Sequence, residues 1–255
     1  MLRLYGAIAV LAARRGVRAW PVMFSLVAYA AIILLGGKLT APLGMAGGFL
    51  MGFVLAACFG SYLHLMAHAV SGSKLRLVDF RDSFGARFWD VISVLFAFWV
   101  INLALKGVIA PAAGDKAPIV ITLFGLAMAV FFNPVPELLY LGTSRSFSLL
   151  LESARFVSRS GLEWLIPNIL FAMALLAPLG MLHGPAGQIV LNIASLISPG
   201  TDGTGLVTVF SRAPLYLQLP MLAFVHFVMV FRGLLFQALT RGGARQRELQ
   251  GAWKR

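Results

Sequence analysis

Six long apolar blocks interrupt the chain, and they limit its possible folds more than any other feature. They cover residues 19–35, 43–65, 91–110, 118–141, 164–182 and 215–239. Each is close to the roughly 17 to 25 residues that cross a hydrocarbon core of about 30 Å as a helix. Of the 255 residues, 60% are hydrophobic and 12% are charged, against about 25% charged in an ordinary soluble domain. We therefore predict an all-α polytopic membrane protein with six transmembrane helices, forming a single integral membrane domain over residues 1–255.

The basic residues gather on one side of the predicted spans and so set the orientation of the chain. Four lysine or arginine residues precede the first span, four follow the second, three follow the fourth and five follow the sixth. The other side has three, which are Lys38, Lys116 and Arg212. Because these residues accumulate in cytoplasmic loops, the bias predicts a bacterial inner (plasma) membrane protein with both termini in the cytoplasm. We expect anionic membrane lipids as partners of this basic surface, and no nucleic acid.

A tryptophan stands at or near the start of the first, third and fifth spans, at Trp20, Trp89 and Trp164. Tryptophan favours the headgroup level of a membrane, where its ring is half apolar and half hydrated. We therefore expect each of the three to mark the entry of a helix and to contact lipid. The recurrence favours a threefold repeat of helix pairs, although any polytopic protein that alternates loops and spans gives a similar pattern. The predicted units are residues 1–70, 71–142 and 143–240, followed by a basic tail at 241–255.

The segment before the fifth span is amphipathic. At 100° per residue, Arg145, Arg155 and Arg159 share one face of residues 144–160, and apolar side chains occupy the opposite face. A helix of this kind lies in the membrane interface, so we expect these arginines to bind anionic lipid on the cytoplasmic side. The segment before the third span is also amphipathic, and the N-terminal segment is less so.

The sequence FFNPVPELLYLG at residues 131–142 places polar residues and prolines at the end of the fourth span. Since proline lacks an amide donor, the helix must kink or stop near the asparagine and leave carbonyl groups that need partners. One interpretation is a kinked exit from the membrane with the glutamate ion-paired or capping a helix. The alternative is a transport site at a broken helix. The candidate polar cluster consists of Asn133, Pro134, Pro136, Glu137 and Arg232.

Small residues occupy every fourth position of the second span. Such a row lets another helix backbone approach closely, since helix association in lipid depends on packing. We predict a tight helix crossing here, with a partner helix from the same chain. The row consists of Gly44, Gly48, Gly52, Ala56 and Gly60.

The sequence offers little material for catalysis or cofactor binding. Cys58 is the single cysteine, which excludes an intrachain disulfide or a cysteine-based metal cluster. His64 and His68 lie four residues apart and can share one helical face, but a metal site needs three or four ligands. No nucleophile and base set, zinc motif or nucleotide motif is present. We predict no enzymatic activity, no cofactor and no metal.

Four segments carry a resemblance to known families: GSKLRLVDFRDSF, NPVPELLYLG, LLESARFVSRSG and LEWLIPNIL. Together they resemble six-helix inner-membrane families of bacteria whose function is uncharacterised. The chain is similar to the YciC-like proteins and to the membrane domain that accompanies some glycerophosphodiester phosphodiesterases. The resemblance implies helix pairs with interfacial helices, and it implies no catalytic residues.

These observations favour a non-catalytic accessory or scaffold protein of the inner membrane, with lipids and other membrane proteins as its partners. The alternative is a small-molecule or lipid transporter or permease component, with a site near the broken helix at 131–142. A lipid-modifying enzyme ranks third, because it needs an acid, base or nucleophile set that the sequence lacks.

Overall fold

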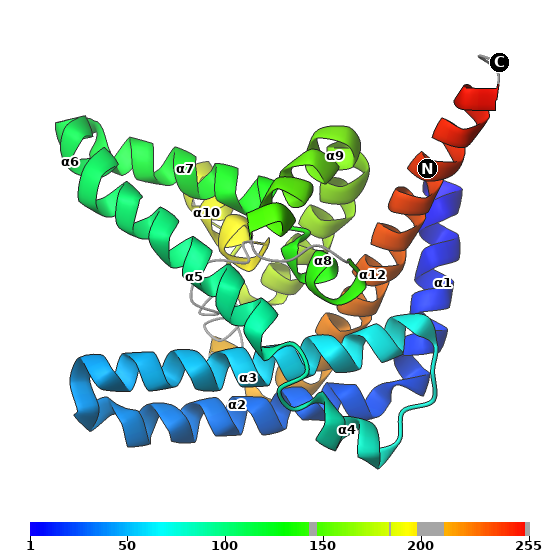
Figure 1. Cartoon of the computed structure of the whole chain (residues 1–255), viewed down its shortest axis with the longest axis horizontal. Helices are drawn as coiled ribbons and strands as arrows, with labels where there is room; N and C mark the ends of the chain where they lie inside the picture. The colour runs from blue at the N-terminus through cyan, green and yellow to red at the C-terminus, as the bar shows by residue number, and fades with distance from the viewer. Residues whose placement is uncertain (143–146, 184, 198–211, 253–255) are drawn as a thin grey trace.

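The described part of the chain contains helices and no strand, so the all-α prediction is confirmed. The computed structural model describes residues 1–142, 147–183, 185–197 and 212–252 (Figure 1). Short 3-10 or π segments join some helices, at Ala41–Leu43, Leu105–Ile109, Gly114–Lys116 and Ala177–Leu179. The helices are α1 (Leu2–Arg18), α2 (Trp20–Thr40), α3 (Gly44–Ser71), α4 (Leu77–Ser83), α5 (Phe88–Ala104), α6 (Ala110–Ala113), α7 (Ala117–Phe131), α8 (Val135–Leu141), α9 (Phe147–Leu176), α10 (Ala186–Ile197) and α12 (Leu215–Ala252).

Four helical stretches are long and apolar enough to cross a membrane: Trp20–Ser71, Val78–Leu141, Phe147–Leu179 and Leu215–Thr240. The first two contain 52 and 64 residues, which would measure about 80 to 95 Å as straight helices. Figure 1 shows that neither stretch is one straight helix. The chain reverses after α2, so that α3 runs back along α2, and it reverses again at α6, between α5 and α7. By length and composition, these helices place the chain among membrane proteins.

Two of the turns that follow long helices share a local sequence. Residues 41–44 and 177–180 both read Ala-Pro-Leu-Gly, and the first three residues of each form a 3-10 turn. Proline has no amide hydrogen to continue the helix, and the glycine adopts a positive φ, 53° at Gly44 and 67° at Gly180. Gly114 adopts the same φ of 53° in the reversal after α5. The Ala-Pro-Leu-Gly sequence is therefore a signal for a helix reversal. The prediction of helix pairs from the tryptophans did not use it.

The main hydrophobic core lies at one end of the helix pairs, where helices from all parts of the chain meet. There α1 runs along α12, and α3 contacts α2, α5, α8 and α12 (Figure 1). Leu63 and Leu65 of α3 and Leu235 of α12 are fully buried in this core. A second, smaller core around Leu176 lies where α9, α10 and α12 meet. Because lipid tails are as apolar as these side chains, close packing and polar contacts hold such helices together.

The row of small residues on α3 does not form the predicted internal crossing along its whole length. Gly44 and Gly48 are exposed, and a Cβ atom added at Gly44, Gly48 or Gly52 would meet nothing within 4 Å. The end of the row is packed, since Ala56 is fully buried. A Cβ atom at Gly60 would lie 3.1 Å from the backbone just before α5.

The physical reason is that the first half of α3 meets α2 through a different face. Gly36 of α2 lies against Met51 and Val54 of α3, and a Cβ atom at Gly36 would lie 3.5 Å from the Met51 sulfur. A row of small residues shows where a helix can approach, but lipid can cover the same row. The prediction of an internal partner is therefore wrong for the first three positions of the row.

The amphipathic segment before the fifth apolar block is the first part of α9. Arg155 and Arg159 are exposed there, and Arg145 lies outside the described residues. The helix bends at Ser160, whose φ of −133° is not helical. Leu150, on the side predicted to face lipid, is buried in the main core because this part of α9 packs on the protein. Part of the apolar face therefore packs on the protein, and the rest is exposed.

Candidate functional site

The chain leaves the helical conformation at the Asn-Pro-Val-Pro-Glu sequence, as predicted. α7 ends at Phe131, and the two prolines cap and begin α8. The carbonyl groups at the break find partners on other helices. The Ser153 hydroxyl donates to the carbonyl of Phe131 at 2.7 Å, and Nη2 of Arg232 donates to the carbonyl of Asn133 at 2.8 Å. Protein groups therefore satisfy both of these carbonyls.

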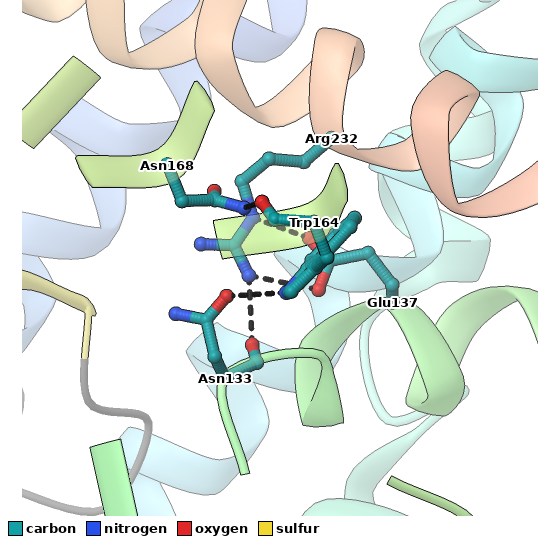
Figure 2. Close-up of polar contacts among 5 residues, drawn as sticks. All are labelled: Asn133, Glu137, Trp164, Asn168 and Arg232. Carbon is teal, nitrogen blue, oxygen red and sulfur yellow. Dashed lines mark hydrogen bonds and ion pairs between the residues drawn. The ribbon is translucent and has the colours of Figure 1, made fainter. Parts of the chain in front are cut away.

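Glu137 of α8 and Arg232 of α12 form a buried ion pair (Figure 2). Nε of Arg232 donates to Oε1 of Glu137 at 2.7 Å, and Nη2 donates to Oε2 at 2.9 Å. The Glu137 side chain is 0% exposed and that of Arg232 is 11% exposed. Such a bidentate pair fixes both the position and the relative orientation of the two side chains. The ion pairing of the two side chains is thus observed, and it joins helices that are far apart in the sequence.

Trp164 is enclosed by protein and does not contact lipid, which corrects the prediction for this residue. It is fully buried beside the ion pair. Its Nε1 donates to Oδ1 of Asn133 at 2.7 Å, and the guanidinium carbon of Arg232 lies 5.2 Å from its ring centre (Figure 2). A hydrogen-bond acceptor and a cation over the ring thus take the place that headgroups would have. Trp20 and Trp89 are 59% and 73% exposed, and their contact with lipid stays a prediction.

Asn168 completes the cluster on α9, one turn after Trp164. Its side chain is buried, and its Nδ2 donates to the carbonyl oxygen of Trp164 at 2.6 Å. Figure 2 shows Asn168, Trp164 and Glu137 around the Arg232 guanidinium, with the Trp164 ring and Glu137 on the same side of it in this view. The guanidinium therefore lies among groups from α8 and α9 while its own backbone belongs to α12.

Two buried hydroxyl groups lie close to the ion pair, on Tyr62 of α3 and Tyr140 of α8. Both interact electrostatically with Glu137 and with Arg232. Neither hydroxyl has a hydrogen-bond partner within the part of the chain that the structure describes. The cluster thus includes unsatisfied polar atoms as well as satisfied ones.

A proline in α9 leaves another carbonyl without its helical partner, and a side chain of α1 bonds to it. Pro167 cannot donate to the carbonyl of Glu163 one turn earlier in α9. The Tyr5 hydroxyl donates to that carbonyl at 3.0 Å instead. A helix that proline weakens is thus attached to the N-terminal helix at the same place.

α1 also contacts the backbone or side chains of two further helices. Arg15 donates to the carbonyl of Val70 in the last turn of α3. Its positive charge also interacts favourably with the negative end of the α3 helix dipole. His226 of α12 lies with Nε2 3.2 Å from the carbonyl oxygen of Gly16. The N-terminal helix therefore contributes to the packed end of the molecule as well as to its surface.

Among the described residues, folding brings no third ligand to the pair of His64 and His68. The ring centres of His64 and His68 lie 5.0 Å apart on α3. In the described ranges, no group of three or more His, Cys, Asp or Glu side chains could hold a metal ion. The single cysteine, Cys58, is buried.

Sequence reasoning brought together Asn133, Glu137 and Arg232 but missed the two tyrosines and the buried tryptophan. The spacing could have indicated Tyr140, since Glu137 and Tyr140 are three residues apart and share one face of α8. Tyr62 had no such signal, because its place in the cluster comes from the packing of α3 against α8.

The fold and the cluster define a class: a helical membrane protein whose packed end contains a buried ion pair at a helix break. No family model, curated protein or solved structure matches the chain. The resemblance to the YciC-like families therefore stays a prediction.

Proposed function

We propose that this chain is a non-catalytic accessory or scaffold protein of the bacterial inner membrane. In this proposal, its role is to hold a fixed arrangement of helices that lipids and other membrane proteins contact. The observation that carries the proposal is the bonding of the Glu137 and Arg232 pair. Both carboxylate oxygens accept from the guanidinium, and the broken helix gives its Asn133 carbonyl to the same side chain. Groups engaged in this way hold the helices in a fixed arrangement, and the charge of each is already matched within the protein.

Six crossings with both termini in the cytoplasm are part of the proposal. Support comes from the reversals after α2 and α5, since each of the two longest apolar stretches folds back on itself. The bias of sixteen basic residues against three supports the orientation. Ala-Pro-Leu-Gly occurs in two of the three proposed units, at 41–44 and 177–180, and this recurrence supports the threefold repeat.

Reporter fusions test this topology. We expect fusions at Lys74 and at the C-terminus to report the cytoplasm, and fusions at Lys38, Lys116 and Asp202 to report the outside. A cytoplasmic signal at Asp202, which lies outside the described residues, would contradict the six-span arrangement.

A transporter or permease component is the second candidate, and one observation favours it. The unpartnered hydroxyls of Tyr62 and Tyr140 lie beside a broken helix in the apolar interior, and transport sites form at such breaks. In this candidate function the ion pair would open to admit a small molecule or a lipid headgroup.

The variant Glu137→Gln separates the two candidates. A scaffold predicts a lower thermal midpoint in detergent, because the amide leaves Arg232 buried without its counter-charge. It also predicts unchanged association with whichever membrane proteins co-purify with the wild type, and no change in flux across proteoliposomes. A variant with full stability that loses flux or association would replace the scaffold with a working site.

A further inference from the structure

Three side-chain hydroxyls form a chain that joins α2, α3 and α4. The Tyr29 hydroxyl lies 2.6 Å from that of Ser61, and the Ser61 hydroxyl lies 2.6 Å from that of Ser83. The Ser83 hydroxyl donates to the carbonyl oxygen of Phe80 in α4 at 2.7 Å. Both serines are 0% exposed. Buried groups at hydrogen-bonding distance therefore connect the first helix pair to α4.

The last bond of the chain fixes the order of its hydrogens. A hydroxyl has one hydrogen to donate. Since Ser83 gives its hydrogen to Phe80, it accepts from Ser61. Ser61 then has no hydrogen left and accepts from Tyr29. All three hydroxyls therefore donate in the same direction, from α2 toward α4, and bonds aligned in this way strengthen one another.

The same turn of α3 also meets the backbone just before α5. A Cβ atom at Gly60 would lie 3.1 Å from the carbonyl carbon of Arg87 and 3.3 Å from the nitrogen of Phe88. The lack of a side chain at Gly60 thus lets the two backbones approach closely. Successive residues of α3, Gly60 and Ser61, therefore hold the connection to α5 at two points.

α4 packs on the protein through one face. Phe80 packs against the main core, and Ser83 is buried. Val78, on the opposite face, is 59% exposed, and Arg81 is exposed as well. Between α4 and α5, Gly85 turns the chain with a φ of 87°, which favours glycine. α4 and the turn after it are therefore attached to the first helix pair.

These contacts determine where α5 begins. Among the other long helices, α5 packs chiefly on α3, and Figure 1 shows it leaving α3 and running away toward α6. We propose that Tyr29, Ser61 and Ser83 form a hydroxyl latch that, together with the close contact at Gly60, sets the angle between the first helix pair and α5. The inference goes beyond the proposed function, because such a joint serves a scaffold and a transporter alike.

A distance measurement on the full chain in nanodiscs tests the angle. Phe49 of α3 and Leu103 of α5 are 67% and 57% exposed. Spin labels on Phe49→Cys and Leu103→Cys, in a Cys58→Ala background, report how far the two helices diverge. We expect one narrow distance distribution while the latch is intact. Ser61→Ala should broaden it about twofold, because the loss of both central bonds of the latch populates local opening.

Hydrogen exchange tests whether the latch holds α4. Ser61→Ala and Ser83→Ala should each raise the exchange rate of amides in Leu77–Ser83 by about fivefold or more, the change in local opening for losing roughly one net hydrogen bond. Tyr29→Phe should raise it less, because both serines keep their acceptors in this variant. If Ser61→Ala does not fold, Ser83→Ala carries both measurements, since it leaves α3 unchanged.

The matched control is Ser93→Ala. Its hydroxyl donates at 2.8 Å to the carbonyl of Trp89 within α5, so the variant also removes a serine hydroxyl but leaves the latch intact. It should change neither the exchange in α4 nor the distance distribution.

Three results would each overturn the proposal. Both readouts could stay unchanged in the two latch serine variants, which excludes a latch. Ser93→Ala could change them equally, which indicates a general loss of stability. Tyr29→Phe could act as strongly as Ser61→Ala, which reverses the order of the hydrogens. None of these results depends on flux or partner association, so failure here is distinguishable from failure of the proposed function.

Discussion

The two ends of the long helices differ sharply in how they are packed. The closed end is the packed end described above, around Glu137, Trp164 and Arg232, and these side chains are buried there. The open end comprises the reversals at 41–44 and 110–114, where apolar side chains near the turns remain exposed. The polar cluster and the main core both lie at the closed end, so packing against protein is concentrated there.

The helices themselves show the same contrast. In the most apolar window of Leu215–Thr240, 50% of the residues are buried, against 17% for Trp20–Ser71. Apolar side chains on the two stretches are similar in kind, so hydropathy does not explain the difference. In a membrane, lipid covers an apolar face as well as protein does. Polar partners and close backbone contacts decide which faces meet protein.

The largest effect is expected from removing the charge at the centre of the closed end. Arg232→Met leaves Glu137 buried and unpaired, which costs about 3 to 5 kcal/mol in comparable buried pairs. We expect a large loss of folded protein in detergent, measured by thermal unfolding or by size-exclusion chromatography. Lys106→Met is the control, because Lys106 is an exposed cation on the Leu105–Ile109 segment. Equal stability of the two variants would refute the central role of the pair.

Two glycines provide a comparison of backbone contact at the two ends. Gly233→Ala places a Cβ atom 2.5 Å from the Tyr140 hydroxyl and 2.6 Å from Val70, and such overpacking typically costs about 1 to 3 kcal/mol. Gly48→Ala, near the open end, meets nothing within 4 Å and should leave the midpoint unchanged or raise it. A loss of stability in Gly48→Ala as large as in Gly233→Ala would mean that both ends are equally packed.

Two tryptophans at similar places in the sequence pattern should also respond differently. Trp164→Phe removes the donor to Asn133 and weakens the contact with Arg232; we expect a loss of about 1 to 2 kcal/mol. Trp89→Phe changes an exposed ring and should have a much smaller effect on the thermal midpoint. If Trp89→Phe is the more harmful change, the burial of Trp164 is not what stabilises the closed end.

The smallest effect concerns lipid. Arg155 and Arg159 are exposed on α9, and basic residues near an anionic surface contribute about 1 kcal/mol each. Replacing both with Gln should reduce the number of anionic lipids retained by the purified protein, measured by native mass spectrometry. Replacing Lys38 and Lys116, at the open end, should reduce it less. A larger reduction from the lysine pair would reverse the predicted orientation.

Much of the fold and part of the site could be predicted from the sequence. Proline chemistry predicted the break near Asn133, and the candidate polar cluster already included both Glu137 and Arg232. The burial of Trp164 and the exposure of Gly48 could not be predicted in the same way. Periodicity shows which residues share a helix face, but in lipid it does not show whether that face meets protein or acyl chains.

The most direct test of the account replaces both members of the ion pair. Glu137→Leu and Arg232→Met should each destabilise the protein strongly, since each leaves one buried charge. The double variant should recover most of the thermal midpoint, because an apolar pair of similar volume can replace a buried ion pair at little cost. Its partner association and flux should equal those of the wild type. Additive losses in the double variant, or a stable double variant without function, would contradict the claim that the pair holds the helices together and does nothing else.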